Sequence, residues 1–380
     1  VFSEDKRIGL VLSGGTAKGL AHIGVLKVLE EEKVPIEYVT GTSMGSIVGG
    51  LYAVGYTPEE IEKIAIEMDW MEVFTDTVPR SDKGAVRNYI EDKNTIALPI
   101  DKFSLSLPNG AIGGKNISTK LGDLFYGVEG VTDFKDFPQK FALVATDLET
   151  GRGVMIDSGS LTTAIRASMS IPTVISPVRY EGKLLVDGGI IRNLPVQDAK
   201  VLGADYTIGV NVGEGFGKLD ENKLSFIDIT TNVLTLAGKE EVERQKRMLD
   251  LYIEPEMSNI QSIDFLKVKE IIDLGEAEAR KHIEEIRKLS DPKKFAEIQE
   301  KRKEFRLTWK NTYKVDKINV EGNKKYKDEY FYKYIPKNLT SMSKEDIDKI
   351  VQSIYSSGDF LTVYYEIKDG FESADKKYGK

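Results

Sequence analysis

The stretch Tyr38–Gly50, "YVTGTSMGSIVGG", holds Ser43 between two glycines, each two residues away. It begins in an apolar run, Ile36–Thr40, that is typical of a buried strand, and it leads into the mainly apolar segment Met44–Tyr56. In a chain with 34 glycines a G-x-S-x-G match arises by accident often enough that it needs this context. A strand, a sharp turn and a helix present a serine hydroxyl as a nucleophile. Ser43 is therefore a candidate nucleophile, and a small residue in a tightly packed helix is the alternative.

The composition of the 380-residue chain indicates a folded globular protein. Apolar residues make up 41% and charged residues 30%, which is enough for a core and untypical of a disordered chain. The length makes two domains a reasonable expectation. The net charge of −8 argues against a nucleic-acid partner, because binding phosphates requires a basic face. It also argues against simple electrostatic attachment to anionic membranes.

Residue counts exclude several kinds of site. The chain has no cysteine, which excludes disulfides, thiolate catalysis and thiolate metal sites, and its two histidines exclude a histidine-rich metal site. For the acyl transfer considered below, neither a metal nor an organic cofactor is needed. Because the chain begins with Val1 rather than Met, we also expect it to be a processed or excised piece.

The first part of the chain alternates between predicted strands and helices. Short apolar runs predict buried strands at Arg7–Leu12, Ile36–Thr40, Phe141–Thr146, Leu184–Val186 and Tyr206–Val212. Between the second and third of these, Thr57 and Glu60 form the capping box of a predicted helix that has Pro58 in its first turn. This alternation predicts an α/β domain with a mostly parallel sheet covered by helices on both faces.

Residues 71–140 are less regular and include the alternating piece "FSLSLPNGAIGG" at 103–114. One interpretation is an insertion on the rim of the sheet. The other is a lid or a wall for an acyl chain, since loops of this length are often functional. In the second case the apolar side chains Phe103, Leu105, Leu107 and Ile112 would contact the acyl chain.

The last third of the chain changes character twice. Residues 267–310 are highly charged with a helical pattern, which predicts a solvated helix. After Asn311, a predicted strand at 313–323, a helix from Ser343 to a stop at Gly358, and a strand at 359–367 form a small β-α-β unit. Such a unit needs at least one more strand to complete a sheet, so we expect the chain to be cut in mid-architecture.

A glycine-rich turn, "SGGTAKG" at 13–19, separates the first predicted strand from the helix that follows it. Successive glycines let backbone N–H groups converge at a helix N-terminus, where negative charge is stabilised. The turn does not satisfy the P-loop pattern, because Gly19 is followed by Leu20. An oxyanion hole is at least as good an interpretation as a phosphate cradle, and a plain tight turn is the structural alternative.

A nucleophilic serine needs a base, and neither histidine suits that role. His22 lies one turn into an apolar-periodic helix, which is typical of a packed core or capping histidine, and His282 lies among charged residues of a solvated helix. A carboxylate is the remaining choice. Asp187 ends a predicted strand before two glycines, and burial would raise its pKa into a useful range. A turn aspartate is the bland alternative, and Asp147 is the rival carboxylate.

Three segments together resemble the bacterial patatin-like phospholipases: "LVLSGGTAKGLAHIGVLKVLEE", "GTSMGS" and "ASMSIPTVISPVRYEGKLLVDGGIIRNLPV". The resemblance covers roughly residues 5–300. It implies a Ser–Asp dyad without histidine, in which Ser43 is the nucleophile and Asp187 the base. The backbone amides of Gly14, Gly15 and Thr16 would form the oxyanion hole. The family commonly has a third glycine where Thr16 stands, so Thr16 is expected to donate if its φ is negative.

Residues from about 311 to 370 are similar to a POTRA domain, through "INVEGN" and "YSSGDFLTVYYEI". The resemblance implies a patatin-like three-layer α/β/α domain at 1–300, a helical linker at 301–312 and an incomplete, small α+β POTRA-like domain at 313–370. Such a chain resembles the passenger of a type V autotransporter, whose outer-membrane β-barrel would be its partner and is absent from this chain. The implied location is the bacterial outer membrane, the cell surface or the medium.

The function implied by the resemblance is hydrolysis of phospholipid acyl esters, of the A1 or A2 type, at a membrane surface and without a cofactor. Two other classes stay open at this point. One is a serine hydrolase that acts on peptides or soluble esters, and the other is a non-catalytic secreted binding module. Substrate comparison separates the first from a lipase, and labelling of Ser43 with a fluorophosphonate separates the second from any enzyme.

Overall fold

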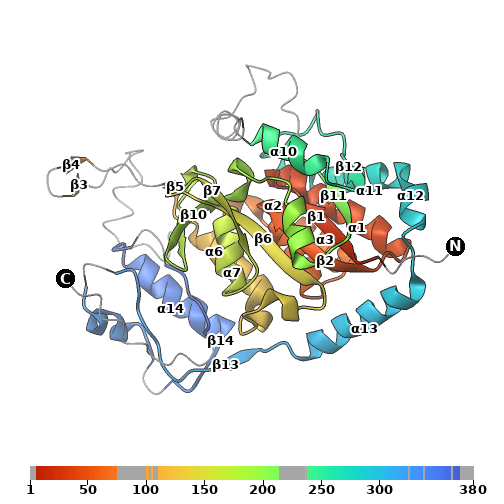
Figure 1. The fold of residues 1–380 in the computed structure, drawn as a ribbon. Coiled ribbons are helices and arrows are strands. Elements are labelled where there is room, and N and C mark those ends of the chain that lie inside the picture. Colours follow the sequence, from red (N-terminus) through yellow and green to blue (C-terminus); the bar gives the residue numbers. More distant parts are fainter. Residues whose placement is uncertain are drawn as a thin grey trace.

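The computed structural model describes residues 6–74, 100–101, 104–105, 110–213, 236, 238–323, 326–336, 339–360 and 363–368. Its centre is an eight-stranded sheet in the order β12-β11-β1-β2-β6-β10-β9, with β7 paired to β6 (Figure 1). The strands are β1 (Ile8–Leu12), β2 (Ile36–Thr42), β6 (Lys140–Asp147), β7 (Arg152–Ile156), β9 (Val178–Tyr180), β10 (Lys183–Asp187), β11 (Tyr206–Val210) and β12 (Leu251–Ile253).

The order of the strands confirms the predicted, mostly parallel sheet. The neighbours from β12 through β11, β1 and β2 to β6 all pair in parallel. The other three strands are antiparallel: β7 and β10 pair with β6, and β9 pairs with β10. Each strand predicted for this sheet is present, with ends that differ by at most two residues.

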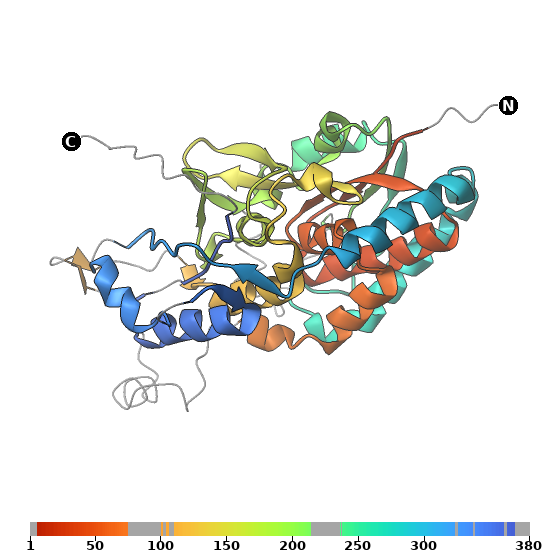
Figure 2. The same ribbon diagram turned by 90° about the horizontal axis from the view of Figure 1, so that it is seen from below.

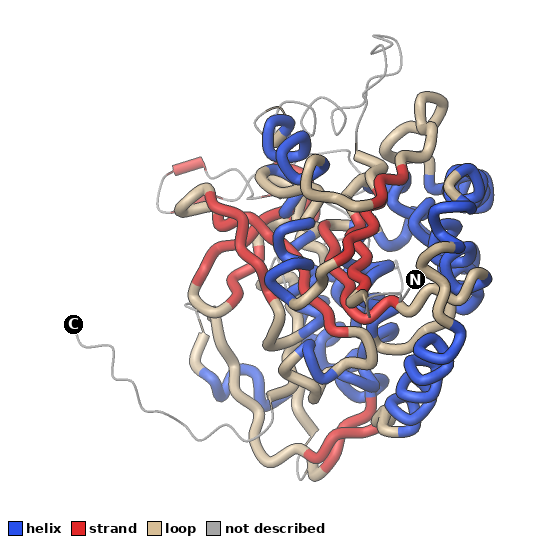
Figure 3. The backbone as a smooth tube through the Cα atoms, turned by 45° about the vertical axis from the view of Figure 1, so that its right-hand side comes forward, coloured by secondary structure: helices blue, strands red, loops and turns tan. Residues whose placement is uncertain are grey.

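Helices cover both faces of this sheet (Figures 1 and 3). The helices nearest to it are α1 (Ala21–Glu31), α2 (Met44–Ala53), α3 (Pro58–Glu67), α6 (Lys115–Phe125), α7 (Leu161–Ser168), α8 (Val196–Leu202) and α11 (Val268–Lys281). Along β1, Leu10 and Leu12 belong to the main core with α1, α2 and α7, whereas Val11 packs with Ala199 and Leu202 of α8. This alternation, which strand geometry imposes, produces the three layers.

The start of α3 has the capping box that the sequence predicted. The hydroxyl of Thr57 accepts the N–H of Glu60, and the carboxylate of Glu60 accepts the N–H of Thr57, while Pro58 opens the helix. Both contacts satisfy backbone donors that a helix end otherwise leaves without partners.

The charged stretch after residue 267 is more deeply packed than predicted. A Cβ added at Gly275 of α11 would lie 1.9 Å from the carbonyl oxygen of Ala21, and one added at Gly24 of α1 would lie 2.0 Å from that of Ile272. The backbones of α1 and α11 are therefore in direct contact. The prediction of a simply solvated helix was wrong for α11, because its apolar residues form one buried face while its charges lie on the other.

Helix α13 (Pro292–Leu307) continues through residue 300, where the sequence predicted the end of the first domain. It packs against the α/β domain through Arg302, which is 2% exposed and bonds to the carboxylate of Glu30 and the carbonyl oxygen of Tyr56. Figure 2 shows α13 running alongside the helices of this domain. Among the helices of the described residues, none has both the length and the apolar character that a membrane crossing requires.

The part of the chain after α13, here called the C-terminal unit, contains a two-stranded antiparallel sheet and a helix. The sheet pairs β13 (Thr312–Lys314) with β14 (Ser341–Ser343), and the helix is α14 (Lys344–Ser356). Ser343 caps α14 as predicted, in a capping box with Asp346. The predicted strand at 313–323 is reduced to its first residues. Within the predicted strand at 359–367, the described residues 359–360 and 363–367 form no strand.

The reason is that residues 363–368 pack through side chains without pairing their backbone. Val363, Tyr365 and Ile367 all contact the apolar cluster around Tyr126, so the alternation of a strand is kept while the hydrogen-bonded neighbour is missing from the described part of the chain. A POTRA-like fold is therefore not established for this unit.

Aromatic residues join the C-terminal unit to the α/β domain. The rings of Tyr126 and Tyr313 meet edge to face with centroids 5.2 Å apart. The hydroxyl of Tyr126 donates to the carbonyl oxygen of Met342 at 2.6 Å, and that of Tyr313 donates to the carbonyl oxygen of Tyr126 at 3.0 Å. Lys344 of α14 pairs with Asp123 of α6 at 2.8 Å. The unit is thus docked against the α/β domain.

Candidate active site

Ser43 occupies the turn between β2 and α2, at the N-cap position of the helix. Its φ of 51° lies in the left-handed region, which is rare for a residue with a side chain. A Cβ at Gly41 would lie 2.3 Å from the carbonyl oxygen of Gly45, and a Cβ at Gly45 would lie 2.4 Å from that of Leu12. Both glycines of the motif are therefore required by close backbone approach. The alternative of a small residue inside a packed helix does not apply to Ser43.

The strand register brings Asp187 to this turn. Strand β2 runs parallel to β6 and ends with Thr42 opposite Val144. Strand β10 runs antiparallel to β6 and ends with Asp187 opposite Ala145. Because β7 occupies the other edge of β6 at these positions, β2 and β10 share one edge and their C-terminal ends face each other. Ser43, the residue after β2, consequently lies beside Asp187.

A hydrogen bond joins the two side chains. The hydroxyl of Ser43 donates to Oδ2 of Asp187 at 2.8 Å, and Oδ1 of Asp187 accepts the N–H of Gly189 at 2.7 Å. Ser43 is 6% exposed and Asp187 is 7% exposed. Burial raises the pKa of Asp187 to about 6, although the bonds from Gly189 and Ser43 act in the opposite direction. The carboxylate is thus a stronger base than an exposed aspartate and is still ionised near neutral pH.

The other titratable residues considered from the sequence are occupied elsewhere. His22 is fully buried, its Nε2–H donates to the carbonyl oxygen of Ser13 at 2.8 Å, and burial lowers its pKa to about 4. It is the packed core histidine that the sequence predicted. His282 follows α11, with Nε2 3.7 Å from the carboxylate of Glu278. Asp147 accepts the hydrogen bonds that close the turn after β6. None of the three lines the pocket at Ser43.

The glycine loop lines the same pocket as Ser43 and Asp187. The N–H of Gly14 is already bonded to Oδ1 of Asn193 at 3.1 Å. The N–H groups of Gly15 and Thr16 have no partner within the described residues. Thr16 has a φ of 48°, so the condition of a negative φ is not met, and Thr16 takes the left-handed conformation that glycine adopts most readily. Two residues that line the pocket thus have main-chain N–H groups without a partner among the described residues.

Asn193 is a residue of this site that the sequence reasoning missed. Its side chain accepts the N–H of Gly14 and donates from Nδ2 to the carbonyl oxygen of Gly14 at 3.2 Å, so it fixes the loop to the segment after Asp187. Its place six residues after Asp187 within one motif is the signal that could have drawn attention to it.

The remaining wall of the pocket is mainly apolar. It includes the side chains of Ile171, Pro172, Ile190 and Val212, together with Gly189, Gly213 and Ser262. The four predicted acyl-chain contacts are not placed there by the described residues. Phe103 and Leu107 lie outside the described residues, and Leu105 is described only as backbone of the short strand β4 (Ser104–Leu105). Ile112 ends β5 (Gly110–Ile112) and packs against the main core.

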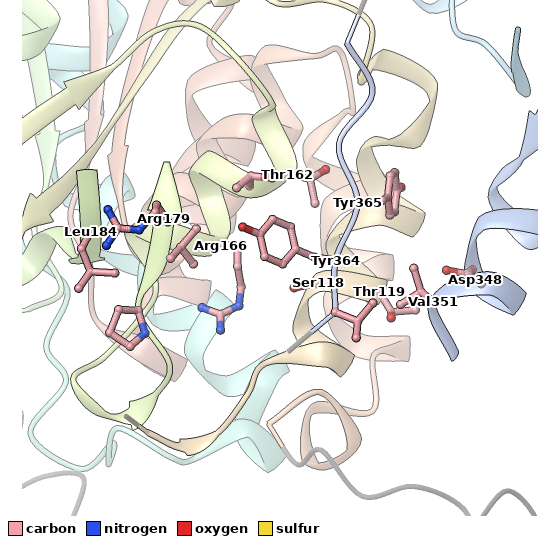
Figure 4. A pocket seen from close by; sticks show the side chains of 14 residues that line it. Ser118, Thr119, Thr162, Arg166, Arg179, Leu184, Asp348, Val351, Tyr364 and Tyr365 are labelled. Carbon is pink, nitrogen blue, oxygen red and sulfur yellow. The ribbon is translucent and has the colours of Figure 1, made fainter. Parts of the chain in front are cut away.

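A larger cavity, of about 210 Å³, lies between the α/β domain and the C-terminal unit. Figure 4 shows Tyr364 in the middle of it, with Arg166 and Arg179 on one side and Asp348 and Val351 on the other. It contains none of the residues predicted for the site. The chemistry therefore belongs to the smaller pocket.

Comparison with known proteins agrees with this geometry. The profile of the patatin-like phospholipases matches residues 10–200, which is half of the chain and includes Ser43, Asp187 and the glycine loop. The chain belongs to the patatin-like phospholipase family. It is accordingly a carboxylic ester hydrolase, and the family predicted from the sequence motifs is confirmed.

Relatives of this patatin-like chain include fungal lysophospholipases. It is 28% identical to lysophospholipase NTE1 of Scheffersomyces stipitis over 297 residues, covering 72% of this chain and 18% of that protein. It is 28% identical to lysophospholipase nte1 of Emericella nidulans over 325 residues, covering 78% and 19%. The chain thus spans about a fifth of the length of these relatives. Among solved structures, VipD from Legionella pneumophila aligns with a TM-score of 0.44 at 16% identity, over 74% of this chain and 67% of that one.

Proposed function

We propose that the patatin-like domain hydrolyses acyl esters of phospholipids through a Ser43–Asp187 dyad. The observation that carries the proposal is the 2.8 Å hydrogen bond from the hydroxyl of Ser43 to the buried carboxylate of Asp187. It lies in a pocket whose loop also offers the unpaired N–H groups of Gly15 and Thr16. Nucleophile, base and oxyanion donors are the three parts that acyl transfer needs.

In the proposed acylation, Asp187 accepts the proton of the Ser43 hydroxyl as Oγ attacks the ester carbonyl carbon. Negative charge develops on the carbonyl oxygen and is stabilised by the N–H groups of Gly15 and Thr16, which are already in place. The C–O bond to the alcohol then breaks, and the alcohol takes the proton from Asp187. The product at this stage is an acyl ester of Ser43.

Deacylation repeats the same steps with water. Asp187 accepts a proton as the water oxygen attacks the acyl carbonyl, and it returns this proton to Oγ of Ser43 as the fatty acid leaves. Each half-reaction begins and ends with an ionised Asp187. The N-terminus of α2, directly after Ser43, adds a favourable dipole for an alkoxide forming on Oγ.

A lipid substrate is supported by the apolar wall of the pocket and by the fungal relatives, which are named as lysophospholipases. The acyl chain in this proposal also contacts Phe103, Leu105, Leu107 and Ile112, which form a wall or lid. A hydrolase of small soluble esters is the competing activity, and the substrate comparison below separates the two.

We also propose that the chain is exported to the bacterial surface as the passenger of a type V secretion system, and that its C-terminal unit is POTRA-like. The motifs "INVEGN" and "YSSGDFLTVYYEI" support this part of the proposal. Protease treatment of intact cells that express the full protein tests it. Surface export predicts digestion of the patatin-like domain before the cells are lysed, whereas protection until lysis would contradict it.

The dyad is tested with Ser43→Ala and Asp187→Asn, using Asp147→Asn as a control at the rival carboxylate. Both dyad variants are expected to lower kcat/KM on a phospholipid by at least about 1,000-fold with unchanged melting temperatures, because each removes a part that the other cannot replace. Asp147→Asn is expected to stay within about threefold of the wild type. Wild-type turnover by folded Asp187→Asn would contradict the dyad.

The acyl-chain wall is tested by serine substitutions at Phe103, Leu105, Leu107 and Ile112. A smaller apolar contact area is expected to weaken cleavage of a long-chain phospholipid more than cleavage of a short-chain ester, by about tenfold for every two methylene groups of the acyl chain that the wall no longer covers. Initial rates on both substrates give this ratio. Equal losses on the two substrates would remove the wall and favour the activity on soluble esters.

A further inference from the structure

Ser43 is held in its unusual backbone conformation by a group outside its own motif. Its main-chain N–H donates to the hydroxyl of Ser168 at 2.9 Å, and this hydroxyl donates to the carbonyl oxygen of Val144 at 2.6 Å. A carbonyl oxygen can only accept, so the Ser168 hydrogen points at Val144 and a lone pair faces the Ser43 amide. Ser168 is fully buried, and its hydroxyl makes both of these bonds away from water.

The contact with Ser168 stabilises a strained backbone conformation at Ser43. A residue with a side chain at a φ of 51° and a ψ of −123° needs its surroundings to keep it there, since relaxation to a common conformation would turn Oγ away. The glycines on either side allow the turn without holding it. The Ser168 hydroxyl holds the main-chain N–H of Ser43 and links it to Val144 of β6. Strand β10, which ends at Asp187, pairs with the same strand.

The same short segment also fixes the base. The carbonyl oxygen of Ser170, two residues after Ser168, accepts the N–H of Asp187 at 2.9 Å. Arg166, which is 4% exposed, donates to the hydroxyl of Ser170 at 2.5 Å and to the carbonyl oxygen of Gly113 at 2.8 Å. The end of α7 is therefore anchored, and it contacts the backbone of both members of the dyad.

The bond to Ser168 also affects which N–H groups can stabilise the oxyanion. Since the N–H of Ser43 is bonded to Ser168, it is not a donor for the substrate, and stabilisation falls to the N–H groups of Gly15 and Thr16. The contact at Ser168 thus belongs to the orientation of the nucleophile and not to charge stabilisation in the transition state.

We infer that Ser168 is a positioning residue for the reaction, which holds the Ser43 turn so that Oγ stays within hydrogen-bonding distance of Asp187. This inference rests on the proposed function. It adds a third side chain to the machinery, one that acts on the backbone of the nucleophile and touches neither substrate nor the reacting atoms.

Ser168→Ala tests the inference, with Ser118→Ala as the matched control. Ser118 is also a buried helical serine, in α6, and its hydroxyl donates to the carbonyl oxygen of Gly114, the N-cap of this helix, at 2.9 Å. We expect Ser168→Ala to lower kcat on a soluble ester by roughly 10- to 100-fold with KM within about threefold, because a misplaced nucleophile reacts slowly without binding less. Ser118→Ala is expected to keep the wild-type kcat.

Labelling of Ser43 with a fluorophosphonate distinguishes positioning from partial unfolding. If Ser168 positions the nucleophile, the Ser168→Ala protein reaches the same final labelled fraction as the wild type, with a rate constant reduced in proportion to kcat. An unchanged labelling rate with a reduced labelled fraction would show a purely structural role and overturn the inference. If Ser168→Ala does not fold, Ser168→Cys replaces it, because the thiol has a similar shape and makes much weaker hydrogen bonds.

The outcomes also separate this inference from the proposed function. An active wild type with fully active Ser168→Ala, or with fully active Ser168→Cys where the alanine variant is unfolded, overturns the inference alone. A folded wild type that cleaves no ester and does not react with the fluorophosphonate overturns the proposed function and the inference together.

Discussion

The side chains of Ser43 and Asp187 are hydrogen-bonded to each other in the structure without substrate. The hydroxyl of Ser43 faces Oδ2 of Asp187, and Oδ1 is held by the N–H of Gly189. His22, the histidine nearest in sequence to the glycine loop, is kept neutral by burial and is bonded to Ser13. At the residue scale, the absence of an available histidine and the raised pKa of Asp187 lead to the same proposal of a carboxylate base.

The raised pKa predicts the pH dependence of the reaction. Asp187 acts as a base only when ionised, which requires a pH above its pKa of about 6, so kcat/KM is expected to fall about tenfold per pH unit below that value. An exposed aspartate would place this limb near pH 4. Rates on a short soluble ester, measured with melting curves at each pH, give the limb. A limb near pH 4 in a folded protein would contradict a buried base.

At the scale of elements, close backbone contacts determine where the site is. Strands β2 and β10 end head to head along one edge of β6, and this arrangement places Ser43 beside Asp187. On one face of the sheet, α1 packs against α11 through Gly24 and Gly275, with no room for a side chain at either position. The glycine loop leads directly into α1, so the packing of this helix also supports the loop.

Gly275→Ala is expected to destabilise the fold. The added Cβ would lie 1.9 Å from the carbonyl oxygen of Ala21, so α1 and α11 must separate. We expect the free energy of unfolding to fall by about 1–3 kcal/mol, a loss that exceeds the helix-propensity gain of alanine.

Chemical denaturation measures this change, with Glu270→Ala as the control. Glu270 is an exposed residue of the same helix, and its replacement is expected to change the free energy of unfolding by less than about 0.5 kcal/mol. Equal stabilities of the Gly275→Ala and wild-type proteins would show that the two helices can move apart without cost.

At the scale of the whole molecule, the C-terminal unit is attached to the α/β domain by specific side chains. Tyr313 contacts the ring of Tyr126, donates to its carbonyl oxygen and accepts the N–H of Gly130 at 3.1 Å. Lys344 adds an ion pair with Asp123. Helix α13, held by the buried Arg302, leads into this contact, so the segment between the two parts is itself packed.

Tyr313→Ala is expected to loosen the C-terminal unit while leaving the α/β domain intact. Loss of the ring contact and of two hydrogen bonds should lower the free energy of local opening, so amide hydrogen exchange in α14 is expected to accelerate at least about tenfold. Tyr332→Ala is the control, because Tyr332 is 61% exposed in the same unit. Unchanged exchange in α14 would show that the unit is held by other contacts.

Local patterns in the sequence were sufficient for much of the fold and for the turn that carries Ser43. The strands, the capping box at Thr57, the helix cap at Ser343 and the turn at Ser43 depend on residues a few positions apart, whose preferences act in any context. The sequence also indicated Asp187 as a base, through its place at a strand end and by elimination of the histidines. The prediction of a strand at 359–367 was wrong for the described residues, because a strand requires a paired neighbour that its own residues do not specify.

Tertiary structure decided which distant groups meet. Ser43 and Asp187 are 144 residues apart, and the register of β2 and β10 along β6 makes them neighbours. The same holds for Asn193 at the glycine loop and Ser168 at the Ser43 amide, because each contacts a residue more than 100 positions away in the sequence. The sequence by itself determined a serine on a strained turn and a carboxylate at a strand end. Only the assembled sheet placed them at hydrogen-bonding distance, because this distance depends on the pairing of β2 and β10 with β6. The local sequence of either strand does not specify that pairing.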